Sequence, residues 1–188
     1  MNNSNSKFDV KDIVYIAFMA AVVFVATFMI QIPTPTGGYV NVGDPMVFLA
    51  AILLGGRKGA IAAAIGGCLS DSIGGYYIYA PFTLVIKAGM ALIVGAIIYR
   101  NSSKVSSPLN NIFAFVSAGI FEVVAYFGAG IVAYYFTGSP HLSIAVIKST
   151  ADVFGNIIQA GFGVIVAVPL VTLLKKNSFF LKIKRIPQ

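Results

Sequence analysis

Charged side chains inside apolar segments are the residues of this sequence best suited to binding a ligand. Asp44, Asp71, Lys87, Glu122 and Asp152 lie within or at the edges of five different hydrophobic segments. Because a charge in hydrocarbon is costly, such side chains usually face a bundle interior or a wet cavity and mark ligand or ion sites. All five fall toward one side of the predicted membrane, so the sequence predicts a dead-ended pocket that opens to that side only.

Four polar residues of the last apolar segment share one helix face. Lys148, Asp152, Asn156 and Gln159 follow one another at i, i+4, i+8 and i+11, which forms a narrow stripe at 3.6 residues per turn. Asn156 and Gln159 either line the pocket or hydrogen-bond between helices. Lys148 either contacts ligand or extends to the lipid headgroups.

Two further charges are open to more than one interpretation. Lys87 either pairs with a carboxylate or contacts the ligand, and the sequence does not decide between these roles. Glu122 stacks on Tyr126 at i, i+4 near the middle of the membrane, with no basic neighbour in its own helix, which favours contact with ligand. Four tyrosines at the pocket mouth form either an interfacial belt or a stacking surface for a flat ligand: Tyr39, Tyr76, Tyr77 and Tyr79.

The composition indicates a single-domain membrane protein spanning residues 1–188. Of the 188 residues, 58% are hydrophobic and only 10% are charged, which is too apolar for a soluble fold of this size. The net charge of +7 comes from basic residues at segment ends, without the aromatic-interleaved stripe of a nucleic-acid site. A lone Cys68 and a lone His141 exclude an intrachain disulfide and a multi-His or multi-Cys metal site.

The apolar pattern predicts an all-α membrane protein with six transmembrane helices. Asp44 and Pro45 together are typical of an N-cap followed by proline at the first helical position. The helix after them has only about 10 residues, or ~15 Å, and cannot cross a bilayer alone. The preceding Pro/Gly-rich loop, 31–43, is therefore expected to dip into the bundle like a re-entrant loop. The six predicted helices cover 11–30, 45–54, 59–73, 81–99, 110–136 and 143–175.

Basic residues predict the orientation of these helices. Lys and Arg occur in the amino terminus, the 55–59 turn, the 100–108 loop and the carboxyl tail, and are absent from 31–43, 74–80 and 137–142. The positive-inside rule then places both termini in the cytoplasm, with residues 1–10 and 176–188 as cytoplasmic tails.

Two pairs of small residues predict close helix contacts in lipid. Ala17 and Ala21 are spaced i, i+4 in the first helix, and Ala60 and Ala64 repeat this spacing in the third. Such pairs serve either internal packing or docking of another membrane protein.

These features together resemble the substrate-binding S components of energy-coupling factor (ECF) vitamin transporters. The resemblance rests on Ala17-x-x-x-Ala21, the stretch from Gly38 to Pro45, the run from Leu54 to Gly59 and the run from Asp71 to Tyr77. It covers about residues 11–175, and the middle stretch looks like the riboflavin/hydroxymethylpyrimidine/vitamin B6 branch.

The resemblance implies a prokaryotic, multi-pass plasma-membrane protein that binds a vitamin outside and releases it inward. Ala17 and Ala21 would dock a transmembrane T subunit carried by two ATPases, so ATP would be used by partners and no cofactor by this chain. The absence of a Gly-x-x-x-x-Gly-Lys-Ser/Thr loop from the sequence agrees with this expectation. The implied substrate-binding residues are Tyr39, Asn41, Tyr77, Lys87, Glu122, Tyr126, Asp152 and Asn156.

The small bundle and a carboxylate such as Glu122 favour a compact ring with donor groups at its edge. Vitamin B6 or hydroxymethylpyrimidine is therefore expected first and riboflavin next. A stand-alone secondary transporter or channel is the main alternative, although neither inverted repeats nor broken midplane helices are visible. An intramembrane enzyme is disfavoured because the only histidine is predicted in an outer loop.

Overall fold

Six helices and one short β-hairpin make up the part of the chain that the structure, a computed structural model, describes: residues 9–100, 108–138 and 141–175. Each predicted helix is present, and the ends differ from the predicted ones by at most three residues. The predicted tails and the 100–108 loop lie mainly outside the described residues. The elements are α1 (Val10–Met29), β1 (Gln31–Pro33), β2 (Tyr39–Asn41), α2 (Asp44–Leu54), α3 (Gly56–Ile73), α4 (Ala80–Tyr99), α5 (Pro108–Phe136) and α6 (Leu142–Lys175).

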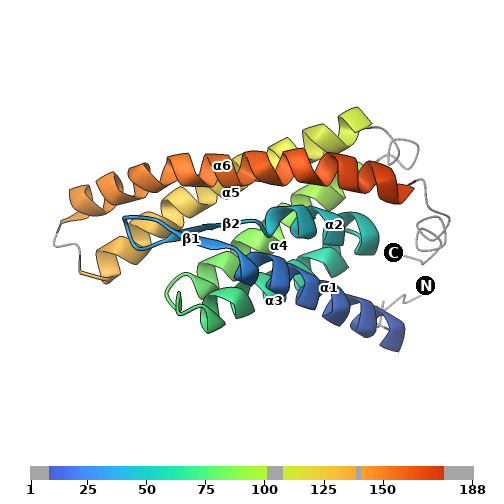
Figure 1. Ribbon diagram of the computed structural model, residues 1–188, viewed down its shortest axis with the longest axis horizontal. Helices are drawn as coiled ribbons and strands as arrows, with labels where there is room; N and C mark the ends of the chain where they lie inside the picture. The colour runs from blue at the N-terminus through green and yellow to red at the C-terminus, as the bar shows by residue number, and fades with distance from the viewer. Residues whose placement is uncertain (1–8, 101–107, 139–140, 176–188) are drawn as a thin grey trace, which may run out of the picture.

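The helices form a bundle in which the hairpin and α2 lie between two helix pairs. Helix α5 packs along α6 and α1 packs on α3, while α4 joins the two pairs through α3 and α5 (Figure 1). Helix α2 contacts α3, α4 and α6. Helix α1 begins and α6 ends at the same end of the bundle (Figure 1). The hairpin lies toward the opposite end, and β2 contacts α6.

Length and composition allow four of the described helices to cross a membrane: α1, α4, α5 and the Leu142–Leu174 part of α6. Helix α2 has 11 residues, about 16 Å at 1.5 Å per residue, which is less than the ~30 Å hydrocarbon core of a bilayer. The prediction that helix 2 is too short to span alone is therefore confirmed, whereas six crossings stay a prediction.

The segment after α1 forms a short β-hairpin inside the predicted 31–43 loop; the all-α class is confirmed, and these two short strands were not predicted. Strands β1 and β2 pair antiparallel, with Gln31 opposite Asn41 and Pro33 opposite Tyr39. The turn is closed by the Thr34 N–H, which donates to the Gly38 carbonyl at 2.9 Å, and by Gly37 at φ +99°. Strand pairing satisfies backbone groups that would otherwise be unpaired inside an apolar bundle.

Close backbone contact between α3 and α4 depends on a pair of glycines. A Cβ added to Gly95 would lie 2.3 Å from the Cα of Gly56, which no real side chain allows. The backbones of α3 and α4 can therefore approach each other directly at this point.

The two alanine pairs noted in the sequence have opposite surroundings. Ala60 and Ala64 on α3 are buried, so this pair serves internal packing. Ala17 and Ala21 on α1 are exposed, within an apolar face that also exposes Val14, Phe18 and Val25 among others. The α1 pair is therefore not needed to pack this chain and remains available to another molecule.

Candidate binding cavity

A small cavity lies between the hairpin, α4, α5 and α6. It encloses about 40 Å³, which is room for about three water molecules. Its lining combines hydroxyl, amide and carboxylate groups with tyrosine rings, as a site for a small polar aromatic molecule requires. The lining residues are Thr34, Gly38, Tyr39, Asn41, Tyr79, Thr83, Tyr126, Gly130, Asp152, Asn156 and Gln159.

Asp152 ties the tip of the hairpin to the last two helices. One carboxylate oxygen accepts a hydrogen bond from the Thr36 hydroxyl in the hairpin turn, and the other accepts one from Tyr134 on α5. The Tyr134 ring is also 5.7 Å from the ammonium of Lys148. These contacts hold the hairpin over the cavity and fix the carboxylate at one of its ends.

Tyr39 closes another side of the cavity by bonding to α3. Its hydroxyl donates to the carboxylate of Asp71, and its ring lies 4.3 Å from that of Tyr76. Tyr39 thereby links β2 to α3.

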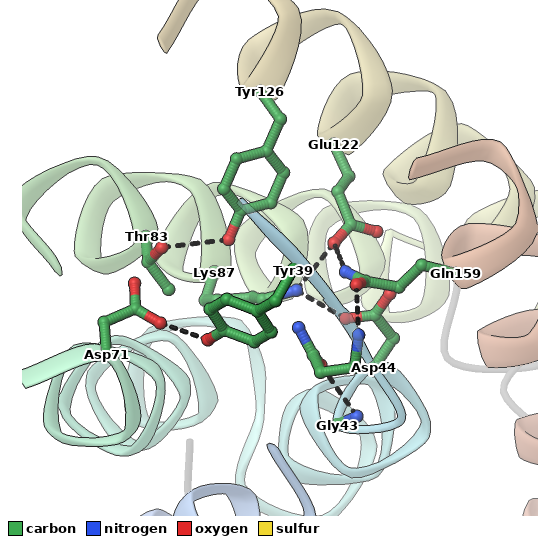
Figure 2. Close-up of polar contacts among 10 residues, drawn as sticks. Tyr39, Gly43, Asp44, Asp71, Thr83, Lys87, Glu122, Tyr126 and Gln159 are labelled. Carbon is green, nitrogen blue, oxygen red and sulfur yellow. Dashed lines mark hydrogen bonds and ion pairs between the residues drawn. The ribbon is translucent and has the colours of Figure 1, made fainter. Parts of the chain in front are cut away.

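A buried charge cluster of Asp44, Lys87 and Glu122 lies beside the cavity. The Lys87 ammonium lies 2.5 Å from Asp44 Oδ1 and 2.6 Å from Glu122 Oε1, and all three side chains are fully buried (Figure 2). The same ammonium is 5.6 Å from the centre of the Tyr126 ring. Lys87 is therefore neutralised by α2 and α5 and has no free charge for a ligand.

Two amides connect this charge cluster to the cavity wall. Gln159 donates from Nε2 to Glu122 Oε1 at 2.7 Å and accepts at Oε1 from the backbone N–H of Asn41 at 2.8 Å. Asn41 in turn accepts at Oδ1 from the Gly43 N–H at 2.9 Å. The hydroxyls of Tyr126 and Thr83 are paired at 3.0 Å nearby (Figure 2). The charge cluster thereby holds in place groups that line the cavity.

The structure brings five of the eight predicted binding residues together around the cavity: Tyr39, Asn41, Tyr126, Asp152 and Asn156. Lys87 and Glu122 lie behind the lining, in the charge cluster. Tyr77 is 71% exposed and does not line the cavity.

The N-cap prediction for Asp44 is wrong. Gly43 occupies the N-cap position of α2 and makes no side-chain cap bond, while Asp44 is already helical. The physical reason is that the Asp44 carboxylate turns inward to the Lys87 ammonium, a stronger partner than a backbone N–H.

Several lining or supporting residues were missed by the prediction of binding residues. Tyr134, which holds Asp152, repeats the spacing of Tyr126 and Gly130 at i, i+4 and i+8, so helical periodicity could have placed all three on one face. Thr36 carried no such signal, because its position depends on the hairpin turn.

Comparison with known proteins identifies the family. The family model described as "ECF-type riboflavin transporter, S component" matches residues 7–176. An uncharacterised protein of Pyrococcus woesei is 35% identical over 157 residues, which cover 82% of this chain and 95% of that protein. The chain belongs to the ECF transporter S-component family.

Solved structures show the same fold. A bacterial ECF transporter S component superposes with a TM-score of 0.66 at 23% identity, covering 88% of this chain and 96% of that one. The biotin S component of an ECF-type ABC transporter gives a TM-score of 0.58 at 19% identity, over 95% and 96%.

Family membership defines the class of this protein, as the resemblance implied. It is the substrate-binding subunit of a vitamin transporter and not an enzyme. It is a multi-pass protein of the prokaryotic plasma membrane, and such subunits work with an ECF module.

Proposed function

We propose that this chain captures a single-ring heteroaromatic vitamin or precursor, vitamin B6 or hydroxymethylpyrimidine, in the cavity beneath the hairpin. The observation that carries the proposal is the small cavity lined by Tyr39, Tyr126 and polar groups of α6. A compact ring can stack on the phenol rings while its edge atoms bond to the amides and the Asp152 carboxylate.

Ligand access requires movement of the hairpin. About 40 Å³ is less room than an aromatic ring with substituents needs, since it corresponds to about three waters. The hairpin tip is held to the bundle chiefly by side-chain bonds such as Thr36 to Asp152. These bonds can break and reform as the ligand exchanges, so the hairpin acts as the cover of the site.

Riboflavin is the second candidate, and the family model supports it. That model carries riboflavin in its description and matches nearly the whole chain. Binding of a three-ring flavin demands a larger displacement of the hairpin than a single ring does. The two candidates therefore differ in how far this segment must open.

Transport of the ligand is energised by partner subunits. We assign the exposed Ala17 and Ala21 of α1 as the surface that docks a T subunit, which two ATPases carry and which couples ATP hydrolysis to inward release. The exposure of this pair supports the assignment, because its packing is not used within the chain. Small residues at i, i+4 allow close approach of a partner helix in lipid.

The orientation of the protein follows from its basic residues. Both termini are cytoplasmic, six segments cross the membrane, and the hairpin faces outward. The position of the start of α1 and the end of α6 at one end of the bundle supports this topology (Figure 1). The cavity then opens to the outside, where a vitamin is captured.

Mass spectrometry of the purified protein tests this function. Protein isolated in mild detergent from cells grown in vitamin-rich medium is expected to carry one small aromatic compound at near-stoichiometric amount. A pyridine or pyrimidine identifies the first candidate and a flavin the second. A co-purifying compound that is neither aromatic nor a vitamin contradicts the proposal. The proposal is also contradicted if calorimetry shows that the purified protein binds neither vitamin B6, nor hydroxymethylpyrimidine, nor riboflavin.

A further inference from the structure

The side-chain amide of Asn41 has a fixed orientation. Its Oδ1 accepts a hydrogen bond from the Gly43 N–H. Because a backbone N–H can only donate, the atom facing Gly43 must be the amide oxygen, and the NH₂ group points elsewhere. Among the described residues, Nδ2 makes no hydrogen bond and is not fully buried, and Asn41 lines the cavity. The NH₂ group is therefore the part of the Asn41 side chain that remains to bond to a ligand in the cavity.

The neighbouring amide of Gln159 is fixed in the same way. Its oxygen faces the Asn41 N–H and its nitrogen faces Glu122, whose carboxylate is held by Lys87. Turning this amide over would place donor against donor and acceptor against acceptor in a fully buried site, which is costly. The oxygens of both amides therefore already accept one hydrogen bond each from the backbone of the 41–43 segment.

The end of the cavity lined by Asp152 offers hydrogen-bond acceptors instead of donors. Each oxygen of Asp152 accepts one hydrogen bond, from Thr36 or Tyr134. A carboxylate has about four lone-pair positions, so capacity for further donors remains. Asp152 and Gln159 lie seven residues apart on α6, about 10 Å along the axis at 1.5 Å per residue. A ligand thus meets donors at the end lined by Asn41 and an acceptor at the end lined by Asp152.

We propose that Asn41 is a specificity-determining residue whose amide donates to hydrogen-bond acceptors of the ligand. The ligand lies with a ring nitrogen or carbonyl edge on Asn41 and with its hydroxyl or amine groups toward Asp152. This inference rests on the proposed function and adds the direction in which the ligand is bound. It also gives the charge cluster a role, because Glu122 and Lys87 hold the amide of Gln159 that supports Asn41.

The test compares two substitutions at Asn41 by isothermal titration calorimetry. Wild-type protein, Asn41→Ala and Asn41→Asp are each titrated with pyridoxine, hydroxymethylpyrimidine and riboflavin. Asn41→Ala removes the donors and is expected to raise the Kd of the bound compound about tenfold. Asn41→Asp places an acceptor against the ligand's acceptors and is expected to raise it about 100-fold.

The ranking of the Kd values of the two variants distinguishes ligand contact by Asn41 from a purely structural role. Aspartate keeps the oxygen that accepts from Gly43, so a purely structural Asn41 predicts near wild-type binding for Asn41→Asp and weaker binding for Asn41→Ala. Near wild-type binding by Asn41→Asp together with weaker binding by Asn41→Ala overturns the inference. Tighter binding by Asn41→Asp than by wild type overturns it too, and in both cases the proposed function stands. If Asn41→Asp does not fold, an unchanged Kd for Asn41→Ala overturns it. Absence of binding by wild type overturns the proposed function as well.

Discussion

Lys87→Met is expected to destabilise the protein by about 3–5 kcal/mol, the usual effect of removing one partner from a buried ion cluster. Methionine fills much of the space of the lysine stem, so packing changes little. The loss of the ammonium leaves the carboxylates of Asp44 and Glu122 fully buried without their counter-charge. Unfolding of purified protein in detergent, followed by circular dichroism against denaturant, measures the effect.

Two further variants make this result specific to the charge cluster. Lys148→Met removes an exposed lysine from α6 and is expected to change the free energy of unfolding by less than about 1 kcal/mol. Combining Lys87→Met with Asp44→Asn and Glu122→Gln removes all three charges and is expected to restore much of the lost stability. Wild-type stability of Lys87→Met alone would contradict the role of this cluster.

Ala17→Trp is expected to abolish vitamin uptake in cells that carry the complete transporter, while the Kd of the isolated subunit changes less than about threefold. The indole would cover the small-residue surface that a partner helix must approach. Because Ala17 is exposed in this chain, the bulkier side chain displaces nothing within the bundle. Uptake of labelled vitamin and calorimetry on purified protein measure the two quantities separately.

The matched control is Val124→Trp, which places the same side chain at an exposed position of α5. Helix α5 packs on α4 and α6, away from the α1 surface, so uptake is expected to continue. Loss of ligand binding by Ala17→Trp would instead assign Ala17 to internal packing. Undiminished uptake would show that the partner docks elsewhere.

The helices were predictable because local signals define them. Pro33 and Pro35 end the first helix region, Pro81 lies in the first turn of α4, and long apolar runs supply the rest. The hairpin was not predictable in this way. Its register is fixed by long-range bonds, such as that from the Asn41 N–H to Gln159, which a single sequence does not reveal.

The depth of polar residues could be predicted better than the direction in which they point. Asp152 and Asn156 share a helix face, and both line the cavity. Lys87 lies at the expected depth on α4, but its long side chain reaches Asp44 and Glu122 instead of the cavity. Tyr77 and Tyr79 are only two residues apart in a turn, yet only Tyr79 lines the cavity, because turn geometry has no simple periodicity.

A structure of the purified protein with its co-purifying compound tests the central claim most directly. The account predicts ligand density enclosed between the hairpin and helices α4, α5 and α6. That density should contact Asn41 at one end and Asp152 at the other, and the Asp44–Lys87–Glu122 cluster should remain intact. Density outside this cavity, or a ligand bonded directly to Lys87 after the cluster has opened, would contradict it.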